Sequence, residues 1–173
     1  MNYRREVPAH PAHRSRQIMN RWLALFLFLL ASFTAAAIGG WATFDAVRTW
    51  YPTLVKPAWN PPGAFFAPVW TVLYILMSVA AWRVWLRREA PMTRPALRLF
   101  FASLVLNTLW SVLFFGLHRP AWAMVDILLL WFTLVILQVR FGRIERLAGW
   151  LWAPYLAWVS FAVTLNAGIC WLN

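Results

Sequence analysis

Five long apolar segments follow one another along the chain, and short polar connections separate them. None of the segments alternates apolar and polar residues with a period of two, and runs such as LALFLFLLASFTAAAIGG are unbroken, which favours helices over the strands of a β-barrel. Each segment has about the 20 residues that a helix needs to cross a bilayer. The pattern predicts an all-α membrane protein, a bundle of five transmembrane helices. The segments span residues 22–44, 65–85, 97–117, 121–139 and 147–171.

The composition agrees with a membrane environment, and the charges orient the chain in it. Hydrophobic residues make up 62% and charged residues 12% of the chain, and the mean hydropathy is +0.61, values that exclude an ordinary soluble domain. The N-terminal tail, the second connection and the fourth connection hold 13 of the 16 Lys and Arg residues. By the positive-inside rule the N-terminus is cytoplasmic and the C-terminus outside. We therefore interpret the net charge of +11 as a topology signal and a contact with anionic membrane lipid, and expect no nucleic-acid partner.

The first 18 residues differ from the rest of the chain. They are polar and basic and contain Pro8 and Pro11, so we expect a disordered tail over residues 1–18 ahead of a five-helix domain over residues 19–173. A cleaved signal peptide is the alternative, which we disfavour because the apolar run that follows is longer than a usual signal-peptide core. A Ser-rich amphipathic presequence of the mitochondrial type is not apparent, which favours a bacterial inner membrane.

Groups for ordinary catalysis are scarce. Cys170 is the only cysteine and excludes an internal disulfide, and the five Asp and Glu residues are scattered along the chain. The sequence has no phosphate-binding loop, zinc-protease or hydrolase motif. We expect no metal site and no required cofactor, and no catalytic residue can be assigned.

A loop rich in Pro and Trp precedes the second apolar segment. Pro57, Pro61 and Pro62 restrict the backbone there and exclude a regular helix, so the sequence predicts a rigid loop that holds Trp59. In the helix that follows, Trp70 and Tyr74 lie four residues apart and share a face. A bulky apolar ligand would meet both the loop and this helix.

Few polar residues fall inside the predicted spans. Asn107 shares a helix face with Trp110, and it would either hydrogen-bond a ligand or hold two helices together; the pattern leaves both interpretations open. Asp126 is the acid within a span, and we expect it near the outer interface, paired with His118 or Arg119.

The last apolar segment carries a four-residue repeat of Pro154, Trp158, Ala162 and Asn166. Ala162 lies one turn from the large ring of Trp158, so the repeat predicts a recess beside a flat aromatic ring. Close helix packing against the small residue is the alternative. Several of the 14 Trp residues are expected to anchor the helix ends at the membrane interface rather than to contact a ligand.

The order of five motifs resembles one known family, TspO/MBR, which includes the tryptophan-rich sensory proteins and the translocator proteins. The resemblance covers about residues 22–171, which is the whole chain except its tail. The motifs are WYPTLVKPAWNPP at 50–62, PVWTVLYILM at 68–77, LNTLWSVLFFG at 106–116, WAMVDILLL at 122–130 and PYLAWVSFAVTLN at 154–166.

This resemblance implies a five-helix bundle, usually a homodimer, with a pocket near the outer leaflet that the first connecting loop covers. It implies a tetrapyrrole or another amphipathic small molecule as ligand, with a porphyrin (protoporphyrin IX or haem) foremost, and sterols and synthetic benzodiazepine-like compounds as further ligands. Cations on the outer side, Arg48, Lys56 and Arg119, are candidates to meet porphyrin propionates. By motif, the lid would consist of Trp50, Tyr51, Trp59, Pro61 and Pro62, and the walls of Trp70, Asn107, Trp110, Trp122, Trp158 and Ala162.

Three functions follow as hypotheses. The first is a receptor or transporter-like membrane protein that binds porphyrins in a Trp-lined pocket and has a sensory or regulatory role. The second is an enzyme that degrades protoporphyrin IX oxidatively in light, with Trp side chains as redox partners. The third is a sterol or lipid transporter, which is disfavoured because the C-terminal LNAGICWLN lacks the Tyr and basic residue of the sterol-recognition pattern.

Overall fold

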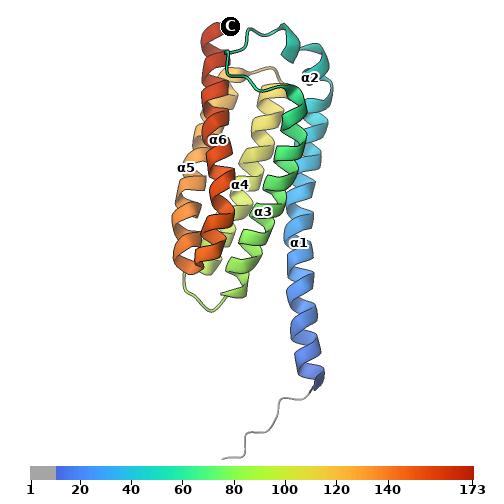
Figure 1. Cartoon of the computed structure of the whole chain (residues 1–173), viewed down its shortest axis with the longest axis vertical. Coiled ribbons are helices and arrows are strands. Elements are labelled where there is room, and N and C mark those ends of the chain that lie inside the picture. The colour runs from blue at the N-terminus through green and yellow to red at the C-terminus, as the bar shows by residue number, and fades with distance from the viewer. Residues whose placement is uncertain (1–10) are drawn as a thin grey trace, which may run out of the picture.

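The computed structural model describes the backbone of residues 11–173 and the side chains of residues 19–173. Long helices dominate it and pack side by side (Figure 1). They are α1 (Pro11–Phe44), α3 (Phe66–Leu86), α4 (Thr93–Ser111), α5 (Pro120–Ile144) and α6 (Arg146–Leu172). Short α2 (Ala46–Thr49) and the 3₁₀ turns η1 (Tyr51–Thr53) and η2 (Gly63–Phe65) belong to the connection between α1 and α3, and a π-helical turn, η3 (Val112–Gly116), extends α4.

Within the described residues, five helices are long and apolar enough to cross a membrane, and this confirms the predicted fold class. Four of the predicted segments lie inside the observed spans, and the third ends one residue beyond its span. The start of α1 and the C-terminus lie at opposite ends of the bundle (Figure 1). Which end faces the cytoplasm stays a prediction, as does the homodimer. The spans are Met19–Thr49, Gly63–Leu86, Thr93–Gly116, Pro120–Ile144 and Arg146–Leu172.

The first helix begins earlier than expected. It starts at Pro11, so residues 11–18, which we assigned to the disordered tail, are helical. Proline suits the first turn of a helix because its fixed φ is already helical and its missing N–H is not needed there. The residues from Ala12 to Met19 contain no Pro or Gly to stop the helix. The part of the predicted tail before Pro11 lies outside the described residues.

The core of the bundle is tightest between α5 and α6. Gly149 of α6 lies against Gly142 of α5, where small residues let membrane helices approach closely. Gln138 Nε2 donates to the Gly149 carbonyl at 3.0 Å, and Trp152 Nε1 donates to the Leu134 carbonyl at 3.2 Å. Trp152 is fully buried. Large apolar side chains elsewhere, such as Trp150 and Trp171, are exposed on the outside, as lipid contact requires.

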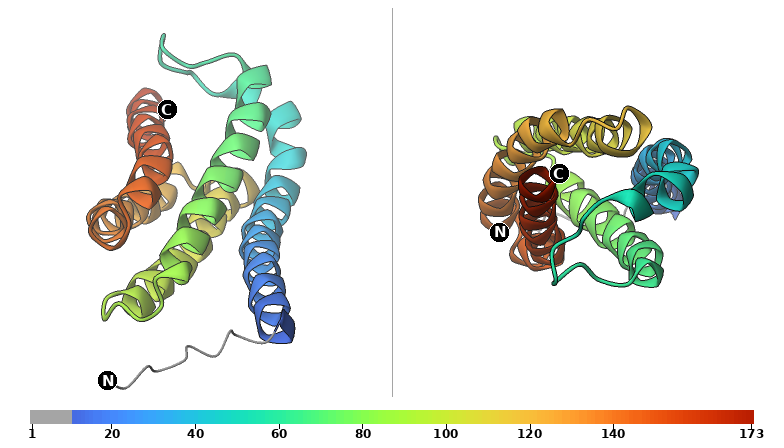
Figure 2. Two further views of the ribbon diagram at one scale, coloured as in Figure 1. Left: turned by 60° about the horizontal axis from the view of Figure 1, so that its bottom comes forward. Right: turned by 90° about the horizontal axis from the view of Figure 1, so that it is seen from above.

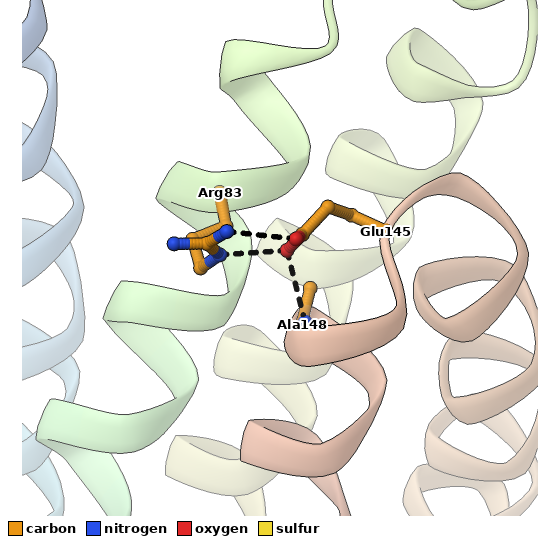
Figure 3. Close-up of polar contacts among 3 residues, drawn as sticks. All are labelled: Arg83, Glu145 and Ala148. Atoms are coloured by element: carbon orange, nitrogen blue, oxygen red, sulfur yellow. Dashed lines mark hydrogen bonds and ion pairs between the residues drawn. The ribbon is translucent and has the colours of Figure 1, made fainter.

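One ion pair ties α3 to the turn between α5 and α6 (Figure 3). Arg83 and Glu145 meet in a two-pronged contact, with Nε 2.7 Å from Oε2 and Nη2 2.8 Å from Oε1. Glu145 also caps α6, because its carboxylate accepts from the Ala148 N–H at 3.1 Å. Only 10% of the Glu145 side chain is exposed. The hydrogen bond from Arg83 lowers the pKa of the Glu145 carboxyl.

We expect Glu145→Gln to destabilise the bundle by about 2 kcal/mol, because it leaves a half-buried guanidinium without its charge partner and weakens a helix cap. The lowered pKa gives a pH dependence: the stabilisation is fully present above the ordinary pKa of a glutamate, and it is lost as the pH falls through the lowered pKa of Glu145. Unfolding of the detergent-solubilised protein in SDS, followed by circular dichroism, measures both effects.

Glu89→Gln is the matched control for this ion pair. Glu89 is 97% exposed and lies 3.8 Å from Arg88, a contact of the solvated kind that contributes little. Equal losses of stability in the two variants would contradict a structural role for the Arg83–Glu145 pair.

Candidate functional site

A cavity of about 1050 Å³ opens between α1, α3, α4 with η3, and α6, beneath the connection that follows α1. Its volume is at the upper end of the ~300–1,000 Å³ typical of small-molecule sites. No residue of α5 lines it. The lining combines aromatic rings with small residues, and each helix contributes at least one ring. The aromatic members are Phe33, Phe44, Tyr51, Phe66, Trp70, Tyr74, Trp110, Phe114, Phe115 and Trp158.

The wall formed by α3 and α6 is aromatic. Trp70 and Trp158 meet edge to face, with ring centroids 6.5 Å apart and planes at 85°, and Phe66 packs on Trp158 at 5.9 Å. Ala162 lies one turn beyond Trp158 and also lines the cavity. The predicted recess beside a flat ring is therefore present in this wall. The small side chain faces open volume here.

A hydrogen-bonded triad forms the floor. Tyr74 donates its hydroxyl to Asn107 Oδ1 at 2.8 Å, and Asn107 Nδ2 donates to the Tyr155 hydroxyl at 2.9 Å. The triad joins α3, α4 and α6 at a depth where Asn107 is 4% exposed. Asn107 thus holds helices together, which is one of the two interpretations that its sequence position left open. It also lines the cavity, so a ligand that bonded to this amide would compete with the two tyrosines.

A second polar contact fixes the tryptophan on α4. Trp110 Nε1 donates to Asn166 Oδ1 at 3.0 Å, and Asn166 Nδ2 donates to the Pro120 carbonyl at 2.9 Å. The Trp110 ring also stacks on Phe114 at 5.3 Å. Asn166 is 1% exposed, so its amide is satisfied inside the protein, as a buried polar group must be. These contacts fix the position of Trp110 in the lining of the cavity.

Residues 54–62, which we call the lid, cross the open end of the cavity. Seen from above, the connection leaves α2, reaches α6 and returns to α3 (Figure 2). Three contacts hold it. Tyr51 donates to Asn60 Oδ1 at 2.7 Å; Val55 exchanges two 3.0 Å hydrogen bonds with the Asn173 amide; and Pro57 packs on Gly168, where an added Cβ would lie 3.1 Å from Pro57 Cγ. Burial raises the pKa of the Tyr51 phenol, so this donor keeps its proton at neutral pH.

Eight of the eleven predicted site residues line the cavity. They are Tyr51, Pro61, Pro62, Trp70, Asn107, Trp110, Trp158 and Ala162. The other three lie elsewhere, each for a local reason. Trp50 stacks on His118 at 4.2 Å and packs edge to face on Phe114 at 5.7 Å. Trp59 is 57% exposed and lies beside Gly168, outside the cavity. Trp122 is 66% exposed, because the neighbouring Ala123 occupies the buried face of α5.

Sequence reasoning missed part of the site. Helix α1 contributes Phe33, Gly39 and Thr43, in a run so uniformly apolar and small that no position stands out. The contacts of Asn60 and Asn173 with the lid also went unrecognised, because they join residues that are not neighbours on one helix face. A lone Asn in a Pro-rich loop is a signal of turn structure, and it would have pointed to Asn60.

Two cations stand at the rim of the cavity. Arg48 lies with its guanidinium carbon 4.3 Å from the Phe44 ring centroid. Lys56 donates to the carbonyl oxygens of Leu54 at 3.0 Å and Pro52 at 3.3 Å. Both line the cavity, whereas Arg119, the third predicted candidate, does not. The described lining contains no Asp or Glu, so this rim favours an anionic group.

The interpretation of Asp126 as a paired interfacial acid is wrong. Asp126 is 5% exposed, and neither carboxylate oxygen has a hydrogen-bond partner among the described residues. It shares the buried face of α5 with Ala123 and Ile127, which directs it into the bundle. His118 is engaged with Trp50 instead.

Comparison with known proteins agrees with this architecture. The TspO/MBR family model matches residues 26–172. The chain is 40% identical to the tryptophan-rich protein TspO of Chlorobaculum tepidum over 92% of this chain and 99% of the relative. It is 39% identical to the tryptophan-rich sensory protein of Cereibacter sphaeroides (90% and 95%) and 34% identical to the human translocator protein (84% and 87%). This five-helix chain, a multi-pass membrane protein, belongs to the TspO/MBR family.

Proposed function

We propose that this protein is a membrane receptor or transporter-like protein that binds a porphyrin in the cavity and has a sensory or regulatory role. The observation that carries the proposal is the combination of a large, ring-lined cavity with two cations at its rim and no acid in its described lining. The names of two relatives, a sensory protein and a translocator protein, agree with such a role.

The shape of the cavity suits a flat macrocycle. Trp158 leaves the small side chain of Ala162 beside its ring, so one face of a tetrapyrrole would stack on the indole without a clash. Trp70 and Phe66 complete the aromatic wall. The ring would thus be held by stacking and apolar contact, which require no metal ligand from the protein.

The rim would orient the porphyrin. Its two propionates would extend toward Arg48 and Lys56, where charge-assisted hydrogen bonds to carboxylates are strong. Lys56 would exchange its bonds to backbone carbonyls for one to a carboxylate. Because Lys56 belongs to the lid, a bound propionate would also help to close the cavity.

The distribution of the cations supports one orientation in the membrane. We propose that the end of the bundle where α1 begins faces the cytoplasm of a bacterial inner membrane. The two connections at that end, from α3 to α4 and from α5 to α6, and the helix ends beside them carry eight of the twelve cations in residues 19–173. The cavity and its lid would then face the opposite side.

A dark titration with protoporphyrin IX, followed by tryptophan fluorescence in detergent, tests the proposal. We expect saturable quenching. Trp158→Leu removes the stacking ring and Ala162→Phe fills the recess, so each should weaken binding roughly tenfold. Trp122→Leu is the matched control, because it removes an exposed Trp outside the cavity, and its affinity should stay unchanged.

Other outcomes of this titration separate the alternatives. Quenching that does not saturate, or that ignores both cavity variants, would rule out the porphyrin assignment, and displacement of a fluorescent sterol would then be measured instead. Loss of the porphyrin absorption band on illumination, in a manner that depends on Trp158, would favour the degrading enzyme over a binding protein.

A further inference from the structure

A second groove, which we call the lower groove, lies at the end of the bundle opposite the lid. Its volume is about 800 Å³, and its lining comes from residues 20–28 of α1, the end of α3 with the connection that follows it, and the first half of α4. These ends of α3 and α4 lie beside the lower half of α1 (Figure 1). The proposed porphyrin function does not use it. Its floor is apolar, with Leu23 and Leu27 from α1 and Phe101 from α4. Its rim carries two arginines, Arg21 and Arg88.

Arg21 belongs to α1 and Arg88 to the connection between α3 and α4, and both are largely free to bind a ligand. Among the residues with described side chains, the Arg21 guanidinium has no acceptor within hydrogen-bond distance. Arg88 packs over the Trp85 ring at 5.0 Å, and its ion pair with Glu89 is 3.8 Å long between groups that are 57% and 97% exposed. Such a pair is weak in solvent. The rim therefore carries two cations, and the acid nearest to Arg88, Glu89, is solvated and binds it only weakly.

The backbone beneath the rim is fixed. Trp82 Nε1 donates to the Arg21 carbonyl at 2.9 Å, and Trp22 stacks on Trp82 with ring centroids 6.0 Å apart. These contacts hold α1 to α3 at the level of the two arginines. The backbone that carries Arg21 is thus held in place by packing against α3.

The depth of the groove matches the border between lipid headgroups and acyl chains. Trp22 and Trp82 stack on each other at the level of Arg21, and Trp85 lines the groove. Trp is the residue that concentrates at this border. The arginines then lie at headgroup level. Leu23, Leu27 and Phe101 continue toward the hydrocarbon, and Leu27 is 53% exposed in the absence of lipid.

We propose that the lower groove binds one anionic phospholipid of the surrounding bilayer, with its phosphate between Arg21 and Arg88 and its acyl chains along Leu27 and Phe101. Basic pockets between transmembrane helices suit such headgroups. A zwitterionic phospholipid carries a cation beyond its phosphate, which the two arginines would repel. An anionic glycerol headgroup has no such cation, so charge complementarity selects it.

Native mass spectrometry of the full chain, released from detergent that contains phosphatidylglycerol or phosphatidylcholine with the same acyl chains, tests this proposal. We expect one tightly retained phosphatidylglycerol. Each cation near an anionic headgroup contributes roughly fivefold in affinity, so Arg21→Gln with Arg88→Gln should lower the affinity roughly 25-fold. The retention of phosphatidylcholine should not change.

Two further variants make the result specific. Arg143→Gln removes an exposed cation from α5, outside the groove, and should leave retention unchanged. Leu27→Trp keeps both arginines but fills the groove from an exposed position, so it should abolish retention without disturbing the core. Circular dichroism checks that each variant is folded.

Three results would overturn the proposal. Equal retention of phosphatidylglycerol and phosphatidylcholine would show that the groove does not select lipids by charge. If Arg143→Gln lowered the retention of phosphatidylglycerol as much as the two groove substitutions do, the lipid would be held by general attraction to a basic surface. Competition by free glycerol phosphate as strong as that by the whole lipid would make the occupant a soluble phosphate rather than a phospholipid.

Discussion

Replacement of Gly149 by Val is expected to destabilise the bundle by about 3 kcal/mol. A Cβ on Gly149 would lie 2.8 Å from Gly142 Cα and 3.1 Å from Gly142 N. Both are backbone atoms of α5, so no side-chain rotation relieves the clash, and α5 and α6 must move apart. The separation would also stretch the 3.0 Å hydrogen bond from Gln138 to the Gly149 carbonyl. Unfolding in SDS, followed by circular dichroism, measures the loss.

Gly142→Ala is the matched control for this helix contact. It adds a methyl group to the other glycine of the pair, yet nothing lies within 4 Å of the Cβ position there. Alanine is also the better helix former, so this variant should be as stable as the parent protein or slightly more stable. If Gly149→Val unfolded at the parent SDS concentration, the close approach of α5 and α6 would contribute nothing to stability.

Replacement of Gly168 by Leu should loosen the lid. An added Cβ would lie 3.1 Å from Pro57 Cγ and 3.6 Å from Trp59 Cζ2, and the rigid proline ring cannot fold away. The lid must then rise from α6, which breaks the pair of 3.0 Å hydrogen bonds between Val55 and Asn173. We expect the Val55 amide to exchange with deuterium at least tenfold faster, because its acceptor is lost.

The same change should affect the proposed ligand. A raised lid withdraws Lys56, Pro61 and Pro62 from the cavity, and we expect protoporphyrin IX to dissociate roughly 30-fold faster, which corresponds to ~2 kcal/mol. Gly63→Ala is the control within the same connection, since its Cβ would meet nothing within 4 Å. Faster exchange at Val55 with unchanged dissociation would show that the lid does not retain the ligand.

Helix periodicity predicted those parts of the site that lie on one helix face. Trp158 and Ala162 are four residues apart and do line the cavity together, as do Asn107 and Trp110. Periodicity gives the face of a helix but not its neighbour. It therefore could not tell that Asn107 would meet two tyrosines, or that Asp126 would be buried with no hydrogen-bond partner in residues 19–173.

Family motifs added residues that periodicity could not, with mixed results. They drew attention to the connection between α1 and α3, where Tyr51, Pro61 and Pro62 line the cavity. They also assigned Trp122 to a wall, yet its ring lies on the exposed side of α5. A motif transfers the identity of a residue, whereas the rotation of each helix about its axis depends on packing across the bundle. For α5 that packing is fixed by Ala123, Ile127 and Leu130 on the opposite side.

Helix α5 contacts α6 and α4 but leaves the cavity to the other four long helices. The helices that form the cavity are thus distinct from the helix that supports them. The outer surface of α5, with Trp122, Leu129 and Phe132 among its exposed side chains, is free to contact a bilayer of different thickness or another membrane helix. Such contacts would leave the lining of the cavity unchanged. Substitutions on that surface should therefore alter the kind of bilayer and the membrane proteins that surround this protein, while its choice of ligand stays the same.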